Sequence, residues 1–598
     1  MLRITLILVA IVVISCGRQK EQIPAVPAMK TDSRKVIIYQ VMTRLFGNKQ
    51  TLNKPYGTLG ENGVGKFADI NDKALQAIKE MGITHVWYTG VIEHGVITDY
   101  TRYGIPLDDA DVVKGRAGSP YAIKDYYDVN PDLANNIPDR MKEFEALIER
   151  THKHGMSVLI DFVPNHVARA YKSDAKPKGV IDLGEFDDNT VRFKPGNNFY
   201  YLPGQSFQVP ADYVALGEGH EFPTKDGKFD ETPAKVTGND QFTATPGIDE
   251  WFETIKLNYG VDIENGRTKH FDPVPDTWVK MKDILVYWAG KKVDGFRCDM
   301  AEMVPVEFWH WVIPQVKAVN PEIIFIAEIY NPDAYRNYIE QGRFDYLYDK
   351  VLLYDTLRLL INKERSTKDI AAIQQRLNGI NANMLHFLEN HDEQRIASRF
   401  FAGNPWKAAP AMVISATVDR GPVMIYFGQE VGEPGEGTEG FQGDDGRTTI
   451  FDYWGVPEHQ KWMNGGAFDG ALLSEDQQRL RNFYSTLLTL SAKHEAIVEG
   501  EYEDITAFNI ENKNFGDDVF ACVRYTSGKR LLIVAGFNAT PRKINVSVPQ
   551  EIAAKLSLDV GKTYSLKDML WQGDELTVIE NAVQVELPAY GAFIFEIE

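Results

Sequence analysis

The segment 293–299, Val-Asp-Gly-Phe-Arg-Cys-Asp, decides how this chain folds. It is a short apolar run that is typical of a buried strand and ends in an arginine and a carboxylate. Three other segments have the same character: 161–166 (Asp-Phe-Val-Pro-Asn-His), 325–328 (Phe-Ile-Ala-Glu) and 387–392 (Phe-Leu-Glu-Asn-His-Asp). Because the ends of parallel strands open onto one face of an α/β protein, we expect these polar residues to meet in one site.

Short β-rich runs alternate with amphipathic helical segments from about residue 35 to 490. This alternation predicts an α/β fold, specifically a (β/α)8 TIM barrel. A doubly wound open sheet is the structural alternative, but no Gly-rich phosphate loop follows an early strand to support it. The eight expected strands lie at 36–40, 83–88, 157–163, 293–298, 323–327, 344–347, 384–388 and 423–427.

The spacing of the acids agrees with a barrel and locates an insertion. Asp299 and Glu328 are 29 residues apart, about one βα unit, whereas Asp161 and Asp299 are 138 apart. We assign the excess to an inserted subdomain after strand three, residues 167–275, which is rich in Gly, Pro, Asp and aromatic residues. In residues 491–598, strand-like runs follow one another without helices and predict a C-terminal antiparallel β-sandwich. One of these runs is 507–510.

Composition narrows the classes of function. The chain has 598 residues, more than one core usually supports, so two or more domains are expected. Its formal net charge of −20 argues against nucleic acid, which binds clustered Lys and Arg. Cys298 and Cys522 lie far apart, so no disulfide scaffold is expected, and Cys298 fits a small core residue better than a nucleophile.

The N-terminus predicts export and anchoring. Residues 4–14 form an apolar run that is too short to span a bilayer and is typical of a signal-peptide core. The following Ser15-Cys16-Gly17 resembles the bacterial lipobox, so residues 1–15 are the expected signal peptide and Cys16 the expected lipid attachment. Residues 16–34 would then tether the fold to a bacterial membrane, on its periplasmic or cell-surface side. A plain secretory peptide that contains a cysteine is the alternative.

Together the four motifs resemble those of the α-amylase family of retaining glycoside hydrolases (family 13). The resemblance covers nearly all of residues 35–598, and four motifs in order are far more specific than any one of them. It implies a barrel with an inserted subdomain after the third strand and a C-terminal β-sandwich. It also implies action on α-glucosidic bonds, chiefly α-1,4, in maltooligosaccharides or starch-like glucans.

Cleavage of a glycosidic bond with retention needs one carboxylate nucleophile and one carboxylic acid. By the resemblance, Asp299 is the nucleophile, Glu328 is the general acid and then the base, and Asp392 binds hydroxyls of the reacting ring. Arg297 lies two residues before Asp299 and shares its face of the strand, where it can hold Asp299 ionised. Apolar neighbours of Glu328 favour the raised pKa that a proton donor needs at neutral pH.

The resemblance also implies residues that bind the sugar or support the acids. Tyr121 would stack on the sugar at the cleavage site. Asp161 would support Arg297, and Arg395 is a candidate for orienting Asp392. The expected substrate-binding residues are Tyr121, His166, Arg297 and His391.

The chain departs from the family pattern at two places beside the site. Ser119 stands where many members have a histidine, and Glu302-Met303 stand where they often have Lys-His. These differences weigh against a standard endo-acting starch amylase and leave an exo-acting α-glucosidase, an oligosaccharide hydrolase and a glucanotransferase open. An inactive glycan-binding lipoprotein is a further alternative, against which the intact acids argue.

The resemblance leaves calcium as the cofactor to test, and no organic cofactor is expected. Asn165 matches a ligand position of the family beside the inserted subdomain. Oxygen ligands of this kind suit Ca²⁺.

Overall fold

The computed structural model describes residues 35–598 except 442, 512–513, 560–561, 574–575 and 579–580. The expected signal peptide, Cys16 and the tether lie outside the described residues. Among the described helices, none is long and apolar enough to cross a membrane.

Eight parallel strands form the central barrel, which confirms the predicted fold class. Neighbouring strands follow the order β15-β14-β13-β12-β5-β2-β1-β16. A parallel bridge between His386 and Val423 joins the two ends of this order and closes the barrel. The strands are β1 (Ile37–Met42), β2 (His85–Thr89), β5 (Ser157–Phe162), β12 (Gly295–Cys298), β13 (Ile324–Ala327), β14 (Tyr346–Tyr348), β15 (Met384–Leu385) and β16 (Val423–Tyr426).

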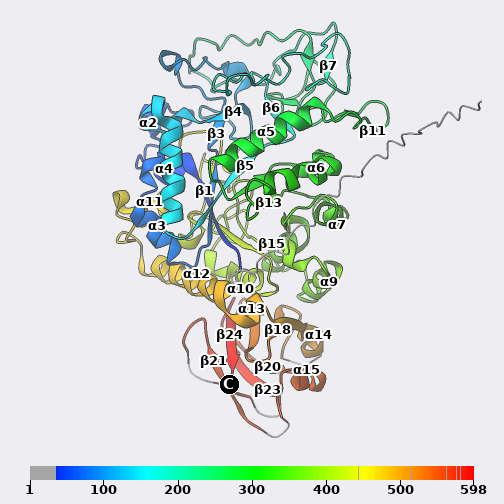
Figure 1. Ribbon diagram of the computed structural model, residues 1–598. Coiled ribbons are helices and arrows are strands. Elements are labelled where there is room, and N and C mark those ends of the chain that lie inside the picture. Colours follow the sequence, from blue (N-terminus) through cyan, green and yellow to red (C-terminus); the bar gives the residue numbers. More distant parts are fainter. Residues whose placement is uncertain (1–34, 442, 512–513, 560–561, 574–575, 579–580) are drawn as a thin grey trace, which may run out of the picture. The chain divides into compact units, whose positions relative to one another are not determined.

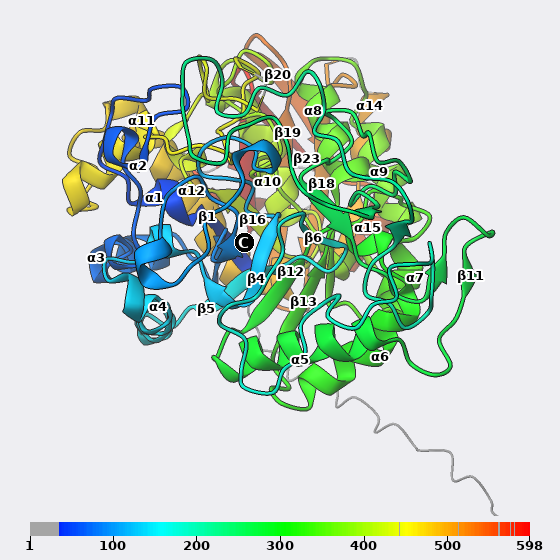
Figure 2. The same ribbon diagram turned by 90° about the horizontal axis from the view of Figure 1, so that it is seen from above.

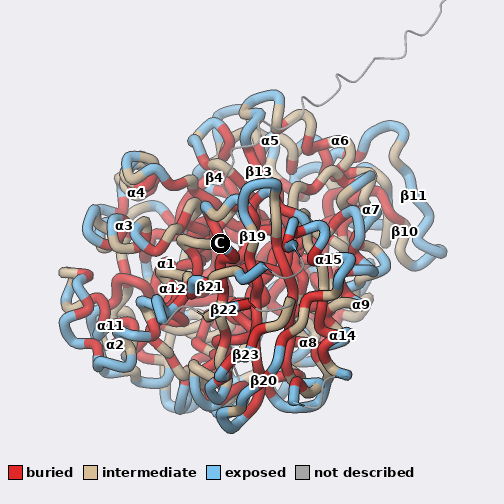
Figure 3. The backbone as a smooth tube through the Cα atoms, turned by 90° about the horizontal axis from the view of Figure 1, so that it is seen from below, coloured by how far each residue is buried: buried red, intermediate tan, exposed pale blue. Residues whose placement is uncertain are grey.

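Helices surround the barrel, as the view along it shows (Figure 2). They bury an apolar face against the strands and leave their outer faces exposed (Figure 3). Capping residues fix where helices begin: Asn71 accepts two backbone N–H groups of α3, and Ser474 and Gln477 form a capping box on α12. The main helices are α3 (Asp72–Lys79), α4 (Arg140–Lys153), α5 (Asp276–Gly290), α6 (Val306–Lys317), α7 (Tyr335–Glu340), α8 (Asp355–Ile361), α9 (Lys368–Arg376), α10 (Ala409–Thr417) and α12 (Glu475–Lys493).

Short elements follow the strands at their carboxyl ends. An antiparallel pair of β3 (Ile92–His94) and β4 (Ile123–Val129) follows β2 and was not predicted. The expected insertion after β5 contains three small antiparallel pairs and a core of its own. These pairs are β6 (His166–Ala168) with β9 (Thr254–Lys256), β7 (Tyr201–Leu202) with β8 (Ala234–Lys235), and β10 (Val261–Asp262) with β11 (Thr268–Lys269).

The C-terminal segment contains antiparallel sheets, as predicted, and packs against α10 and α13 (Glu495–Val498) (Figure 1). The expected strand at 507–510 is wrong, because these residues form helix α14 (Thr506–Ile510). The Asp504 carboxylate accepts the backbone N–H of Thr506 and so favours a helical start. The first sheet has the strand order β17 (Glu501–Asp504), β18 (Val519–Tyr525), β19 (Arg530–Gly536), β24 (Ala592–Ile597), β21 (Tyr564–Asp568) and β22 (Leu576–Val578). The second sheet pairs β20 (Arg542–Ser547) with β23 (Ala582–Leu587), and helix α15 (Gln550–Lys555) follows β20.

Candidate active site

The strand register brings the predicted acids together. Cys298 on β12 pairs with Ala327 on β13, so Asp299 and Glu328 are adjacent as they leave their strands. The backbone N–H of Asp299 donates to Phe162 O (2.9 Å) and that of Glu328 to Cys298 O (3.1 Å). These bonds continue the ladder past the strand ends and fix where both side chains begin.

Arg297 is the centre of this cluster and is fully buried. Its Nη1 donates to Asp299 Oδ1 at 2.7 Å and lies 3.6 Å from Asp161 Oδ1, as expected from the sequence. Its Nη2 lies 2.7 Å from Glu328 Oε1, although the N–H is not aimed at that oxygen. Tyr348 OH accepts from Nε at 3.3 Å. One guanidinium therefore holds three carboxylates around it.

The environments of the three acids drive their pKa values apart. Burial raises the pKa of Glu328 to about 7, although Arg297 opposes this rise. Burial also raises the pKa of Asp299, again against Arg297. For Asp392, burial is outweighed by His391, Arg297 and Arg447, so its pKa lies below the ordinary value. Such a division suits a protonated Glu328 beside an ionised Asp392.

The buried His391 contacts the Asp392 carboxylate. Its Nε2 lies 3.0 Å from Asp392 Oδ2 and within hydrogen-bond reach of Tyr121 OH. Its Nδ1 lies 2.8 Å from the Gln40 amide nitrogen, which can only donate, so Nδ1 accepts and Nε2 carries the hydrogen. Gln40 was missed in the sequence, although it lies near the end of β1, and strand ends were the signal used for the other residues.

A cavity of about 380 Å³ opens above these groups. Of the residues predicted from the sequence, Tyr121, His166, Asp299, Glu328 and Asp392 line it, whereas Arg297 and His391 lie buried beneath and act through their neighbours. The rest of the lining combines one ion pair, Lys114–Glu253 (2.8 Å), with the hydroxyl side chains of Ser119 and Thr254 and with apolar or aromatic side chains. These further lining residues are Lys114, Ser119, Trp251, Glu253, Thr254, Met300, Tyr330, Phe441, Ile450 and Phe451.

His166 reaches the cavity from β6. Its ring lies against Trp251, with centroids 5.3 Å apart, and its Nδ1 is 3.0 Å from the Asn165 amide nitrogen. Burial, assisted by the charge of Lys256, lowers the pKa of His166 to about 3. The imidazole is therefore neutral and can exchange hydrogen bonds with a sugar hydroxyl.

Arg395 does not take the position expected for it. Its Nη1 donates to Glu389 Oε2 (3.0 Å) and to Phe427 O (2.8 Å), and its Nε donates to Thr448 Oγ1 (2.8 Å). Asp392 is instead held at its carbonyl oxygen by Arg447 Nε, at 2.7 Å. The buried Glu389, from the same motif as Asp392, is therefore the carboxylate that pairs with Arg395.

The surroundings of Asn165 do not fit a calcium ion. The Lys256 ammonium donates to Asn165 Oδ1 and pairs with Asp240 Oδ1 at 2.8 Å. A cation already neutralises these oxygens, so a divalent ion beside them would meet a buried positive charge. In the described part of the chain, the acids that could hold a metal are Glu93, Asp125 and Asp174.

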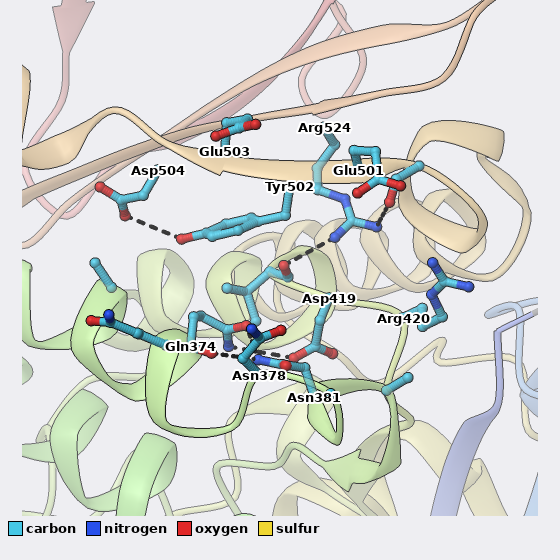
Figure 4. A pocket seen from close by; sticks show the side chains of 16 residues that line it. Gln374, Asn378, Asn381, Asp419, Arg420, Glu501, Tyr502, Glu503, Asp504 and Arg524 are labelled. Atoms are coloured by element: carbon cyan, nitrogen blue, oxygen red, sulfur yellow. Dashed lines mark hydrogen bonds between the residues drawn. The ribbon is translucent and has the colours of Figure 1, made fainter. Parts of the chain in front are cut away.

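A larger cavity, of about 550 Å³, lies away from the acids (Figure 4). It is lined by Asn381 and Asp419, which precede β15 and β16, and by residues of β17. It therefore lies at the face where the barrel strands begin. Arg524 spans it by donating to the carbonyl oxygens of Val418 and Gly500, which joins the barrel to the C-terminal sheets. Active sites of such barrels lie at the other face.

Comparison with known proteins agrees with this geometry. Residues 40–206 and 272–500 match the family model described as "Alpha amylase, catalytic domain". Alpha-amylase 3 of Dictyoglomus thermophilum is 22% identical over 579 residues, which cover 91% of this chain and 93% of the relative. An alpha-amylase of Streptomyces lividans is 25% identical over 429 residues, covering 66% and 43%.

Solved structures share the fold. A maltogenic alpha-amylase of Thermotoga neapolitana superposes with a TM-score of 0.58 at 18% identity, covering 94% of this chain and 98% of that one. An alpha-amylase of Geobacillus thermoleovorans, solved with acarbose, gives 0.58 at 17% identity, covering 94% and 98%. The family match spans most of the chain and includes the segments that carry all three acids. The chain therefore belongs to the α-amylase family and is a glycosidase of that family.

Proposed function

We propose that this protein hydrolyses α-1,4-glucosidic bonds of maltooligosaccharides or starch-like glucans with retention at the anomeric carbon. The observation that carries the proposal is Arg297, whose guanidinium lies 2.7 Å from both Asp299 and Glu328. A retaining enzyme needs its nucleophile and proton donor close together, on either side of one bond. Relatives named as α-amylases, and a solved relative that binds acarbose, support the substrate class.

In the first step, Glu328 gives its proton to the glycosidic oxygen while an Asp299 carboxylate oxygen bonds to the anomeric carbon. The C–O bond to the leaving sugar breaks, and that sugar departs as a neutral alcohol. Arg297 offsets the negative charge on Glu328 as the proton leaves. Asp392 binds ring hydroxyls and favours the distorted ring of the transition state.

In the second step, the Glu328 carboxylate takes a proton from water. The water oxygen bonds to the anomeric carbon and the bond to Asp299 breaks, which restores both acids. Two displacements at one carbon retain its configuration. The high pKa of Glu328 suits both roles, because the group can give and accept a proton near neutral pH.

Incubation with maltoheptaose tests the proposal. Shorter sugars, first formed as the α-anomer by NMR, are the expected result. Asp299→Asn should abolish turnover, with Asp333→Asn as a surface control that retains it. Glu328→Gln should lose activity on maltoheptaose but still release fluoride from α-maltosyl fluoride, whose leaving group needs no proton. Normal turnover by Asp299→Asn would show that the nucleophile is another residue.

A glucanotransferase is the second candidate, and the apolar wall of the cavity is the observation that favours it. Trp251, Phe441, Ile450 and Phe451 line the site and would shield an Asp299-linked sugar from water. A cyclomaltodextrin glucanotransferase of Paenibacillus macerans is also 22% identical over 430 residues. Products longer than maltoheptaose indicate transfer. Binding without any change of the sugar indicates an inactive glycan-binding protein.

We also propose export and lipid anchoring through Cys16. The apolar run at residues 4–14 and the Ser15-Cys16-Gly17 sequence support it. Metabolic labelling with a radioactive fatty acid should mark the wild-type protein and not Cys16→Ser. A variant that takes up label equally would exclude this attachment.

For calcium, we propose that any site uses Glu93, Asp125 and Asp174 and not Asn165. Glu93 is buried, and its Oε2 has no hydrogen-bond partner among the described residues. The Lys124 ammonium lies 4.0 Å from Glu93 Oε1, but it pairs more closely with Asp108, at 3.0 Å. An orphaned carboxylate oxygen is a suitable ligand for a hard cation. Calorimetric titration with calcium should detect binding to the wild type and its loss in Glu93→Gln. Binding that persists in Glu93→Gln would place the ion elsewhere.

A further inference from the structure

Tyr330 is a pocket residue that the mechanism above does not use. Its hydroxyl donates to Glu328 Oε1 at 2.9 Å, and its ring lines the cavity. The residue follows Glu328 by two positions, after the chain has left β13. Nothing in the local sequence marks this contact, because it depends on the turn that follows the strand.

Glu302 explains why Tyr330 stays in this position. Its two carboxylate oxygens accept the backbone N–H groups of Tyr330 and Asn331, both at 3.2 Å. Tyr338 OH donates to the Glu302 carbonyl oxygen at 3.1 Å. Glu302 is one of the residues that depart from the family pattern, and here its side chain ties the segment after Asp299 to the segment after Glu328.

The groups that face Glu328 distinguish its two oxygens. Oε1 accepts the Tyr330 hydroxyl and lies 2.7 Å from the Arg297 guanidinium, whose N–H is not aimed at it. Among the described residues, Oε2 accepts only the backbone N–H of Met300, at 2.8 Å. The other charged groups that act on Glu328 are the carboxylates of Asp299 and Asp392, which donate no hydrogen bond when they are ionised. A proton on Oε1 would lie beside the positive charge of Arg297 and would displace the hydrogen that Tyr330 donates, so the proton belongs on Oε2.

We propose that Tyr330 is a positioning residue for Glu328, held in place by Glu302, and that together with Arg297 it leaves Oε2 as the oxygen that carries the proton. The proposal rests on the proposed function, since it assumes that Glu328 is the proton donor. Tyr330 also stabilises the carboxylate that remains after proton transfer, because hydrogen bonds to a charged group are stronger than those to a neutral one.

Tyr330→Phe tests the hydroxyl while leaving the ring in the cavity. Loss of one donor to a carboxylate should raise the pKa that limits kcat/KM at high pH by about one unit. It should also lower kcat about tenfold, because Glu328 is then less well oriented. Tyr335→Phe is the matched control, since it removes a buried hydroxyl that contacts none of the three acids.

A double-mutant cycle tests the link to Glu302. Glu302→Ala should shift the pH profile in the same direction as Tyr330→Phe, and it should add little in the Tyr330→Phe background. An unmoved pH profile in Tyr330→Phe with kcat within about twofold of wild type would overturn the proposal, as would fully additive effects. If Asp299→Asn is inactive in the same assay, such a result rejects the role of Tyr330 alone and leaves the proposed function standing.

Discussion

Replacing Lys256 with methionine tests whether an ammonium group fastens the inserted segment to the barrel. Lys256 Nζ pairs with Asp240 Oδ1 at 2.8 Å and donates to Asn165 Oδ1, and its side chain is only 4% exposed. Methionine keeps an unbranched chain but removes the charge and the donors. Among the described cations, the Asp240 carboxylate would then retain only Arg267, at 3.4 Å, and Asn165 Oδ1 would lose the hydrogen bond from Lys256.

The expected loss of stability follows from these contacts. Removing one partner of a buried ion pair costs about 3–5 kcal/mol, and an unsatisfied buried amide oxygen costs about 1–3 kcal/mol. Asp240 is 19% exposed and keeps Arg267, so its share lies at the low end. Burial of Lys256 lowers its own pKa, and that desolvation cost disappears in the variant. We expect the free energy of unfolding to fall by about 3 kcal/mol.

Urea unfolding followed by tryptophan fluorescence measures this loss, and limited proteolysis shows whether cleavage concentrates within residues 167–275. Lys269→Met is the control, because Lys269 lies in the same segment but pairs with Glu307 at the surface, where a loss of no more than about 1 kcal/mol is expected. Excess calcium should restore neither variant. Equal stability of the two variants, or recovery of Lys256→Met in calcium, would refute the reasoning.

Three further predictions concern titration and reactivity. Because burial raises the pKa of Glu328 to about 7, kcat/KM on maltoheptaose should fall as pH rises above 7, and a profile that stays flat to about pH 9 would contradict this assignment. For His386, burial opposes the charge, but Asp419 and Asp349 outweigh it and raise the pKa to about 9. The charged His386 therefore contributes fully to the free energy of unfolding below about pH 6.5, and this contribution, up to about 3 kcal/mol, is lost as pH rises through about 9. This part of the pH dependence of unfolding should be missing in His386→Asn. Cys298 and Cys522 are buried, and burial raises both thiol pKa values, so a thiol reagent should label them only after unfolding.

The barrel and its acids could be predicted because local patterns determine both. Each strand is a short apolar run, and Asp299, Glu328 and Asp392 lie just past such runs, where parallel strands all end on one face. Arg297 was predictable for the same reason, since alternate residues of a strand share a face. The positions of these residues follow from two facts alone: alternate residues of a strand share a face, and parallel strands end on the same side of the barrel.

Other features depend on contacts that the local pattern does not contain. Arg395 was expected to orient Asp392, but the buried Glu389 is its partner. The calcium expectation at Asn165 came from the family resemblance, and the residue that contradicts it, Lys256, lies 91 positions away and supplies an ammonium group. At 507–510, a short and mostly apolar run suggested a strand, and the Asp504 side chain favours a helix instead.

The first described residue, Lys35, has a consequence for how the protein meets its substrate. Lys35 is buried and donates to the carbonyl oxygens of Ala416 and Asp419, just before β1 begins. The described chain therefore enters the barrel at the face where strands start, and the catalytic cavity opens at the face where they end. A substrate that enters the cavity therefore does not pass the point where the described chain begins.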